Sequence, residues 1–425
     1  MTVLSADWVL PVGSPPIENG AVAFDHGVIT AVGTAAELGA GERFEEAVIL
    51  PGFVNAHSHI EYAGYAGFGD GLSFPPWIGL HVARKRRLDQ TDMEAMAVLG
   101  AAECLRSGIT TVGDCSFSGA AAVACDAVGL RAIVYLEVFG VDARALAGFD
   151  ELHARVAGSF SDRVVAGVSP HAPYTCGIEL YEACASLGLP LATHLSESEA
   201  ELEYLRSGRG PWEALAEYLV PPLRRGAIGA LAEARVLGST VIAAHCVHVT
   251  AEEIELLADT GTAVAHCPRS NALLGCGVAP LTALREAGVR LCIATDSPAS
   301  TPSFDMFDEL RSAVLAARAR ERRPDALTTT DALELATLGG ATALGLDAEI
   351  GTLEPGKQAD FAIVSLADSP FLPWEDPAGA VVLGGSPDRV VATLVAGEER
   401  YRKGGTTWHA STSRARQARA RMLEA

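Results

Sequence analysis

Between residues 52 and 345 the sequence alternates short apolar, β-rich runs with longer Ala-, Leu- and Glu-rich stretches that are typical of helices. The runs that we predict as strands are 52–59, 109–114, 131–138, 163–170, 190–195, 240–246, 262–267 and 290–295. Helices are predicted between them, for example at 91–107, 177–188, 198–206, 251–260 and 279–288. Eight strands with intervening helices indicate a (β/α)8 barrel.

An open, doubly wound sheet is the alternative architecture for such an alternation. The first predicted strand is not followed by the GxGxxG pattern that marks the dinucleotide-binding turn of those sheets. Polar residues instead follow the carboxyl ends of many strands, where barrels carry their chemistry. The sequence therefore predicts the α/β class, with a barrel rather than an open sheet.

The two ends of the chain have a different pattern from its middle. Residues 1–50 and 351–400 contain short, partly alternating apolar runs interrupted by Gly and Pro, as in "GAVAFDHGVITAVG" and "RVVATLVAGEERY". We expect the two ends to form one small β-sandwich domain together. The predicted domains are a composite β-sandwich of 1–51 and 346–405, a catalytic barrel of 52–345, and a basic surface helix in the tail, 406–425.

The formal net charge of −21 argues against a nucleic-acid backbone or an anionic membrane as a partner. No apolar run is as long as a membrane span, and the start, "MTVLSADWVL", has neither the basic region nor the apolar core of a signal peptide. The nine cysteines are scattered without a CxxC pair, as expected of reduced thiols. The sequence predicts a cytoplasmic protein with a small-molecule substrate, and leaves a homo-oligomer open.

Two histidines stand one residue apart at the end of the first predicted strand, in "PGFVNAHSHIEYAG". Side chains at i and i+2 of a strand point to the same face, so the rings of His57 and His59 could hold one ion between them. A hydrogen-bonded pair of structural histidines would give the same spacing. Other strand ends have to supply the remaining ligands if a metal is bound here.

Four further strand ends carry polar groups that a barrel would bring to the same mouth. These groups are His171, His194 with Glu197, His245 with His248, and Asp296. A lone histidine at one such position is more often structural, whereas several histidines and an aspartate at one barrel face are hard to explain by packing. Neutral imidazoles and a carboxylate suit Zn²⁺ or Fe²⁺, so the sequence predicts a metal site.

The chain resembles the amidohydrolase superfamily, and within it the nucleoside and nucleobase deaminases related to chlorohydrolases. The resemblance covers nearly the whole chain and rests on motifs in the family's order: "PGFVNAHSH", "SPHAPYT", "THLSE", "AAHCVH", "CPRSN", "TDSPAS" and "LEPGKQADF". It implies a metal-bearing barrel flanked by a β-sandwich from both chain ends, which agrees with the pattern described above.

By position, the resemblance implies one divalent metal, Zn²⁺ with Fe²⁺ as the alternative, bound by His57, His59, His194 and Asp296. Relatives with two metals have a bridging Lys after the fourth strand, and "VSPHAP" contains none, so a single ion is expected. The remaining implied roles are Glu197 as proton donor to the substrate ring, His245 as a contact of the attacking oxygen, Asp296 as an additional proton acceptor, and His171 as a substrate contact.

Three other features could contact a substrate at the barrel mouth. Trp77, in "LSFPPWI", could stack on a substrate ring or be a packed lid residue. Arg269, in "CPRSN", could clamp a carboxylate or pair with a nearby acid. The basic run "ARKRR" at 83–87 is typical of a solvated helix face, from which one Arg could reach into the site.

Among the deaminases, the resemblance is strongest to those acting on aminodeoxyfutalosine in menaquinone biosynthesis, through "HSHIEY", "HLSESEAELEYLRSGRGP" and "CPRSNALLGCG". Pro75 and Pro76 stand where S-adenosylhomocysteine and methylthioadenosine deaminases usually have a ribose-binding Glu, and a cation at Arg269 would suit a benzoate. We therefore expect 6-amino-6-deoxyfutalosine to be hydrolysed to futalosine and ammonia. The alternatives are deamination of S-adenosylhomocysteine, methylthioadenosine, adenosine or guanine, an imidazolonepropionase, and a metal-stabilised scaffold without turnover.

Overall fold

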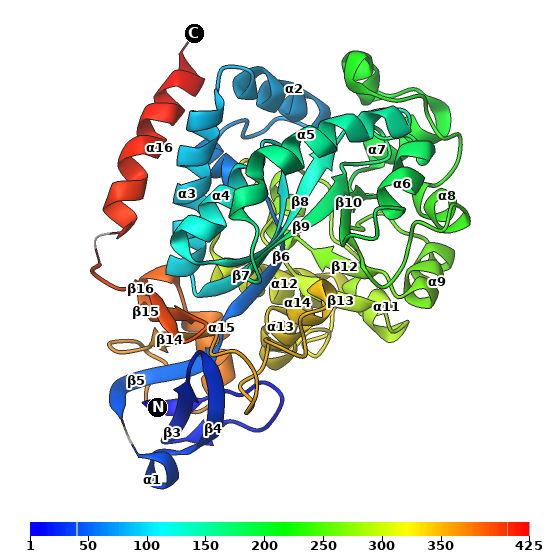
Figure 1. Cartoon of the computed structure of the whole chain (residues 1–425). Helices are drawn as coiled ribbons and strands as arrows, with labels where there is room; N and C mark the ends of the chain where they lie inside the picture. Colours follow the sequence, from blue (N-terminus) through cyan, green and yellow to red (C-terminus); the bar gives the residue numbers. More distant parts are fainter. Residues whose placement is uncertain (40, 406, 425) are drawn as a thin grey trace.

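The computed structural model of the chain describes residues 1–39, 41–405 and 407–424. Two sheets organise this part of the chain, a parallel barrel surrounded by helices and a second sheet beneath it (Figure 1). The barrel fold expected from the sequence is confirmed. None of the helices within the described ranges combines the length and the apolar character needed to cross a membrane.

The barrel consists of eight strands that pair in parallel in chain order. They are β6 (Phe53–Ser58), β7 (Ile109–Ser116), β8 (Arg131–Val138), β9 (Val164–Pro170), β10 (Leu191–Leu195), β11 (Val241–His245), β12 (Ala263–His266) and β13 (Arg290–Ile293). Each predicted strand is present, with ends that differ from the expected bounds by a few residues.

The first and last barrel strands meet through a short parallel contact between Ser58 and Asp296. The Asp296 backbone N–H donates to the His57 carbonyl at 3.0 Å. Beside this bond, the side-chain amide of Asn55 forms hydrogen bonds to Thr295 in a position where strands usually pair through their backbones. It accepts from the Thr295 N–H at 2.9 Å and donates to the Thr295 hydroxyl at 2.7 Å. The barrel is therefore closed next to the predicted site.

Alternation along the strands decides which side chains fill the barrel. In β8, Ile133 and Tyr135 belong to the cluster inside the barrel. The residues between them, Ala132, Val134 and Leu136, pack in the layer between the strands and the surrounding helices. Both sets are apolar because a parallel barrel strand is buried on both faces.

The helices and 3₁₀ turns lie mostly between and outside the barrel strands (Figure 1). Up to β10 they are α1 (Ala35–Leu38), η1 (Ile60–Tyr65), α2 (Phe74–Lys85), α3 (Gln90–Arg106), α4 (Ala120–Val128), η2 (Ala143–Ala145), α5 (Leu146–Val156), η3 (Ala157–Ser159) and α6 (Ile178–Ala185). Those that follow are α7 (Glu199–Ser207), η4 (Pro211–Tyr218), α8 (Ala227–Glu233), α9 (Ala251–Thr260), α10 (Pro268–Leu273), α11 (Leu281–Glu286), α12 (Met306–Glu321), α13 (Thr329–Leu335), α14 (Leu338–Leu344), α15 (Pro377–Gly384), η5 (Pro387–Arg389) and α16 (Thr407–Leu423). Sequence-coded caps fix several starts. Thr250 and Glu253, for example, form a reciprocal capping box at α9.

The second sheet is built from both ends of the chain, as the sequence predicts. Its strands are β1 (Thr2–Val9), β2 (Ile17–Glu18), β3 (Gly20–Asp25), β4 (Val28–Thr34), β5 (Glu42–Pro51), β14 (Phe361–Ser365), β15 (Val390–Val395) and β16 (Glu398–Arg402). They form one connected sheet in the order β16-β15-β14-β5-β1-β3-β4, with β2 on β1. In β5, Ala47 and Ile49 face the sheet's own core, whereas Val48 and Leu50 face the barrel side.

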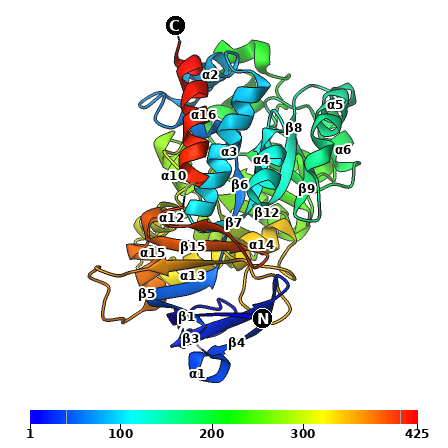
Figure 2. The same ribbon diagram turned by 60° about the vertical axis from the view of Figure 1, so that its left-hand side comes forward.

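The C-terminal helix α16 lies alongside α3 in both views (Figures 1 and 2). Ala418 and Met422 are buried against the main core, and Arg421 forms an ion pair with the buried Asp92. The tail was expected to be a basic surface helix, and the structure adds that one of its faces is packed. The domain bounds at 51/52, 345/346 and 405/406 remain a prediction.

A buried ion pair links the lower end of the barrel to the second sheet. Arg131 begins β8, and its Nε donates to Asp360 Oδ2 at 2.9 Å, while its Nη2 donates to Asp360 Oδ1 at 3.3 Å. Asp360 Oδ1 also accepts from the Ala396 backbone N–H at 2.6 Å. The pair therefore holds the sheet at the end of the barrel opposite the site, where residues of such barrels generally serve stability.

We predict that Asp360→Asn lowers the free energy of unfolding by about 3–5 kcal/mol, because it leaves the Arg131 guanidinium buried without its counter-charge. Glu398→Ala is the matched control. It removes a carboxylate that is 68% exposed and paired with Arg400, where a loss of at most about 1 kcal/mol is expected. Thermal and denaturant unfolding of both variants would measure the difference. Equal effects would show that Asp360 does not tie the two sheets together.

Candidate metal centre and active site

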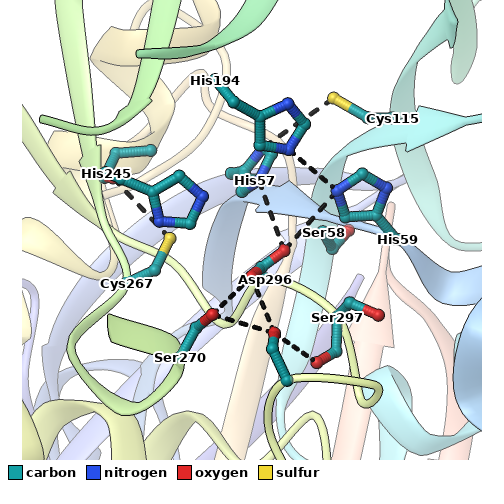
Figure 3. A network of polar contacts seen from close by, with 12 residues as sticks. His57, Ser58, His59, Cys115, His194, His245, Cys267, Ser270, Asp296 and Ser297 are labelled. Atoms are coloured by element: carbon teal, nitrogen blue, oxygen red, sulfur yellow. Dashed lines mark hydrogen bonds and ion pairs between the residues drawn. The ribbon is translucent and has the colours of Figure 1, made fainter. Parts of the chain in front are cut away.

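Four side chains from three separated strands meet at the carboxyl end of the barrel. His57 lies in β6, His59 follows it, His194 lies in β10 and Asp296 follows β13. Their potential ligand atoms all lie within 4.8 Å of one another, and all four residues are buried. Figure 3 shows the three imidazoles and the carboxylate pointing toward one another. We call this group the tetrad.

The spacing within the tetrad fits one small ion. His59 Nε2 lies 3.2 Å from His194 Nε2, and Asp296 Oδ1 lies 3.5 Å from Nε2 of both His57 and His59. Ligands at roughly 2.0–2.1 Å from a tetrahedral ion are about 3.3–3.4 Å apart. His57 Nε2 is buried and has no hydrogen-bond partner among the described residues. A buried, unpartnered nitrogen at this position is what a metal ligand requires.

Neighbouring groups fix which atom of each ligand faces the centre. His194 Nδ1 donates to the backbone carbonyl of His171 at 2.7 Å, which leaves the Nε2 lone pair for a metal. The hydroxyls of Ser270 and Ser300 donate to Asp296 Oδ2 at 2.6 and 2.8 Å. Because Oδ2 is occupied in this way, Oδ1 is the oxygen that faces the histidines. The outer contacts therefore orient the ligands before any ion binds.

Burial also sets the charge states that a metal site needs. Loss of solvation lowers the pKa of His59 to about 3 and holds the pKa of His194 well below its usual range. Burial alone would raise the pKa of Asp296, but the His57 contact and the nearby imidazoles lower it overall. His59 and His194 are thus neutral and Asp296 is ionised at neutral pH, which are the forms that coordinate a divalent cation.

Glu197 and His245 lie beside the tetrad. Glu197 is 3% exposed, and its Oε2 lies 3.7 Å from His245 Nε2. Burial, reinforced by the charge of Asp296, raises the pKa of Glu197 well above its usual value, which favours the protonated carboxyl. Burial lowers the pKa of His245 to about 4. His245 Nδ1 donates to Asn271 Oδ1 at 3.0 Å, so its Nε2 faces Glu197 as an acceptor.

Two site residues have a left-handed backbone that is uncommon for side chains other than Gly. His245 has φ +73° and Asp296 has φ +59°. Each lies where its strand ends and the chain turns across the barrel mouth. Such conformations cost free energy and persist where the surrounding structure enforces them, as at many functional sites. Nothing in the sequence pattern distinguishes these two positions from ordinary strand ends.

The structure also contains orienting residues that the sequence did not reveal. Glu201 is one of two acids in the first turn of α7, and it is fully buried. Its carboxylate accepts from the backbone N–H groups of Ser196 and Glu197, at 3.1 and 2.8 Å. Ser270 and Asn271 lie within the motif "CPRSN", where only the arginine had been considered. Nothing in the sequence indicated that Ser270 would donate to Asp296 or that Asn271 would accept from His245.

A cavity of about 620 Å³ lies next to the tetrad. His171 and Trp77, both predicted substrate contacts, are among the residues that line it. Trp77 is buried and stacks on Phe68, with ring centroids 5.7 Å apart. Of the basic run at 83–87, Lys85 and Arg86 line the cavity. A basic side chain does reach the site from this helix, as the sequence analysis allowed.

Arg269 does not line this cavity. Its guanidinium is buried behind the wall, where Nη1 donates to the Asp305 carbonyl at 2.9 Å and lies 3.5 Å from Glu309 Oε2. Of the two roles considered from the sequence, the placement favours pairing with a nearby acid over clamping a substrate carboxylate. The sequence located Arg269 after the correct strand but could not show which way its side chain turns.

Comparisons with known proteins place these observations in a family. A model of the amidohydrolase family matches residues 48–400. A 5-methylthioadenosine/S-adenosylhomocysteine deaminase from Moorella thermoacetica is 34% identical over 409 residues, which cover 92% of this chain and 91% of that protein. The crystal structure of an adenosine deaminase from Xanthomonas campestris with bound zinc has a TM-score of 0.87 at 29% identity, covering 99% of this chain and 98% of that one. An aminofutalosine deaminase from Helicobacter pylori has a TM-score of 0.77 at 23% identity over 94% of this chain and 100% of that one, a likeness of fold.

We predict one equivalent of a divalent metal per chain, bound by the tetrad. His57→Ala should abolish stoichiometric binding, because it removes the ligand that faces both His59 and Asp296. His26→Ala is the control, since that imidazole is 94% exposed and remote from the tetrad. Elemental analysis after dialysis would measure the stoichiometry. Two equivalents in the wild type, or one retained in His57→Ala, would contradict the assignment.

Proposed function

The chain belongs to the amidohydrolase family, and from that premise we propose that it is a metal-dependent hydrolase that deaminates the adenine ring of a nucleoside. The observation that carries the proposal is a buried Glu197 facing His245 beside the tetrad, in a cavity lined largely by aromatic and aliphatic side chains, where burial raises the pKa of Glu197. The relatives from Moorella and Xanthomonas, both named as deaminases of adenine nucleosides, support the same reaction class.

The reaction needs a nucleophilic oxygen, a proton for the ring nitrogen next to the attacked carbon, and a route for ammonia to leave. A divalent ion, when bound by the tetrad, lowers the pKa of coordinated water toward neutrality. Glu197 supplies the proton to the ring nitrogen, because its raised pKa keeps the carboxyl protonated until a substrate basic atom is present.

His245 and Asp296 act on the attacking oxygen and its proton, whereas Glu197 acts on the substrate ring. The neutral His245 offers Nε2 toward the attacking oxygen, and its ring is held by the hydrogen bond of Nδ1 to Asn271. The pKa of Asp296 is held low by its surroundings, so its carboxylate can act as a proton acceptor. Glu197, once deprotonated, can then receive a proton and pass it to the departing amino group.

The preferred nucleoside among the candidates is a 5′-modified adenosine of the methylthioadenosine and S-adenosylhomocysteine type. The sequence analysis put aminodeoxyfutalosine first. We now put it second, because a relative at 34% identity over most of both chains is named as a methylthioadenosine/S-adenosylhomocysteine deaminase. The likeness to the aminofutalosine deaminase lies at 23% identity and concerns the fold.

Aminodeoxyfutalosine remains the second candidate on one observation within the cavity. Phe117 and Phe139 are 40% and 39% exposed there, and Arg86 lies at its edge with the guanidinium 5.4 Å from the ring centroid of Tyr218. Exposed aromatic faces next to a cation suit an aryl carboxylate. S-adenosylhomocysteine also carries a carboxylate, so the cation by itself does not separate the two substrates.

The test is ammonia release and the ultraviolet change of the base with a panel of aminated substrates. The panel contains adenosine, 5′-deoxyadenosine, methylthioadenosine, S-adenosylhomocysteine, aminodeoxyfutalosine and guanine. We expect turnover of adenine nucleosides and the highest kcat/KM for a 5′-modified one. Turnover of guanine alone, or of none of these compounds, would overturn the proposal. A preference for aminodeoxyfutalosine of tenfold or more would reverse the order of the two candidates.

We predict that Glu197→Gln keeps the metal and the fold but loses about 10²–10⁴-fold in kcat, because an amide cannot deliver the proton. Glu199→Gln is the matched control, two residues further along the same segment and exposed to solvent. Steady-state kinetics together with elemental analysis would separate loss of chemistry from loss of metal. Near-normal turnover of Glu197→Gln would remove it as the proton donor.

Two properties lie outside these tests. A cytoplasmic location remains a prediction from the sequence, which leaves a homo-oligomer open. Cell fractionation and light scattering of the purified protein would address them.

A further inference from the structure

A third carboxylate, that of Glu137, lies in the same cavity without a role in the chemistry described above. Glu137 is the last but one residue of β8, and alternation places it on the face of Ile133 and Tyr135. Those two side chains fill the barrel interior, so Glu137 stands one layer above them, at the barrel mouth. It is 7% exposed and lines the cavity next to the tetrad.

The carboxylate of Glu137 lacks the partners that a buried acid normally has. Its Oε1 is buried and has no hydrogen-bond partner among the described residues. The neighbouring Glu61 differs, because its two oxygens accept from the backbone N–H groups of Phe117 and Ser118 and from the hydroxyls of Ser116 and Ser118. Glu137 Oε1 is therefore an acceptor for which the described residues provide no donor.

The charge of Lys85 opposes the effect of burial on the pKa of Glu137. Burial raises the pKa of Glu137 to about 8, and the nearby Lys85 ammonium opposes that rise. Lys85 Nζ is also held over the ring of Phe117, 3.5 Å from its centroid. Lys85 already supplies a positive charge near Glu137. The unpartnered Oε1 of Glu137 therefore suits a neutral hydrogen-bond donor, such as a hydroxyl, better than a second cation.

The position of Glu137 indicates which part of a substrate would meet it. Glu137, Lys85, Phe117 and Phe139 line both the cavity at the tetrad and a second one of about 490 Å³ next to it. A nucleoside whose base reaches Glu197 and whose 5′ substituent enters the second cavity would have its sugar between the two. The sugar carries the hydroxyl donors, and Glu137 lies at that boundary.

We propose that Glu137 determines specificity by accepting hydrogen bonds from the 2′- and 3′-hydroxyls of the substrate's sugar, with Lys85 as its counter-ion. This rests on the proposed function, because it presupposes a nucleoside. A hydroxyl bound to a charged acceptor in a buried site contributes about tenfold to a hundredfold in kcat/KM. The proposed role of Glu137 is in binding the sugar and not in the proton transfers.

The experiment compares adenosine with 2′,3′-dideoxyadenosine on the metal-loaded full-length protein. In the wild type, loss of the two hydroxyls should lower kcat/KM by about tenfold or more. Glu137→Gln, which keeps the shape and removes the charge, should cost about tenfold to a hundredfold on adenosine and less than threefold on the dideoxy compound. Glu182→Gln, an exposed acid on α6, is the control and should change neither.

The outcomes separate the inference from the function on which it rests. Equal losses on both substrates in Glu137→Gln, or a wild type that does not distinguish them, would overturn the inference and leave the deaminase intact. A wild type that deaminates neither compound, nor any aminopurine nucleoside of the panel, would overturn the proposed function and this inference together. The wild-type comparison does not depend on whether the variant folds.

Discussion

The hydrogen bond from the Asp296 N–H to the His57 carbonyl joins the last strand of the barrel to the first. Both residues are also members of the tetrad. The hydrogen bond that closes the barrel therefore also fixes the positions of two of the ligands relative to each other. Asn55 and Thr295 reinforce the same junction from a layer below. An ion bound by the tetrad would cross-link β6, β10 and β13, and its binding free energy would then stabilise the folded barrel.

The pKa values of two carboxylates in one buried site are shifted in opposite directions by their surroundings. Asp296 accepts from two serine hydroxyls and faces imidazoles, which outweighs the cost of burying its charge. Glu197 Oε2 lies 3.7 Å from His245 Nε2, and burial is the main cause that raises the pKa of Glu197. A pair of acids whose environments separate their pKa values in this way is suited to acid–base catalysis. The structure thus provides both a proton donor and a proton acceptor without a change of residue type.

The barrel strands position the residues for the reaction, whereas the outer wall of the cavity positions residues that could select the substrate. The tetrad, Glu197 and His245 come from strand ends, whose positions the barrel hydrogen bonds fix. Trp77, Lys85 and Arg86 come from α2 and the residue after it, and Tyr218 comes from η4. These segments lie outside the barrel ladder and could vary while the strand ends stay in place. The reaction class is therefore better constrained by the fold than the substrate is.

The apolar runs by themselves determined the eight barrel strands, because a strand buried on both faces has to be continuously apolar. They also predicted that both chain ends join one sheet. The strand ends offered several candidate ligands, and the resemblance to the family selected His57, His59, His194 and Asp296, which the structure brings together. Only the tertiary structure decided the direction of Arg269, which pairs with Glu309 behind the cavity wall. It also revealed Glu201 as a buried acceptor and Glu137 as a buried acid whose Oε1 has no donor among the described residues. These roles depend on contacts between segments far apart in the chain, and local patterns of polarity carry no information about which donor a long side chain will meet.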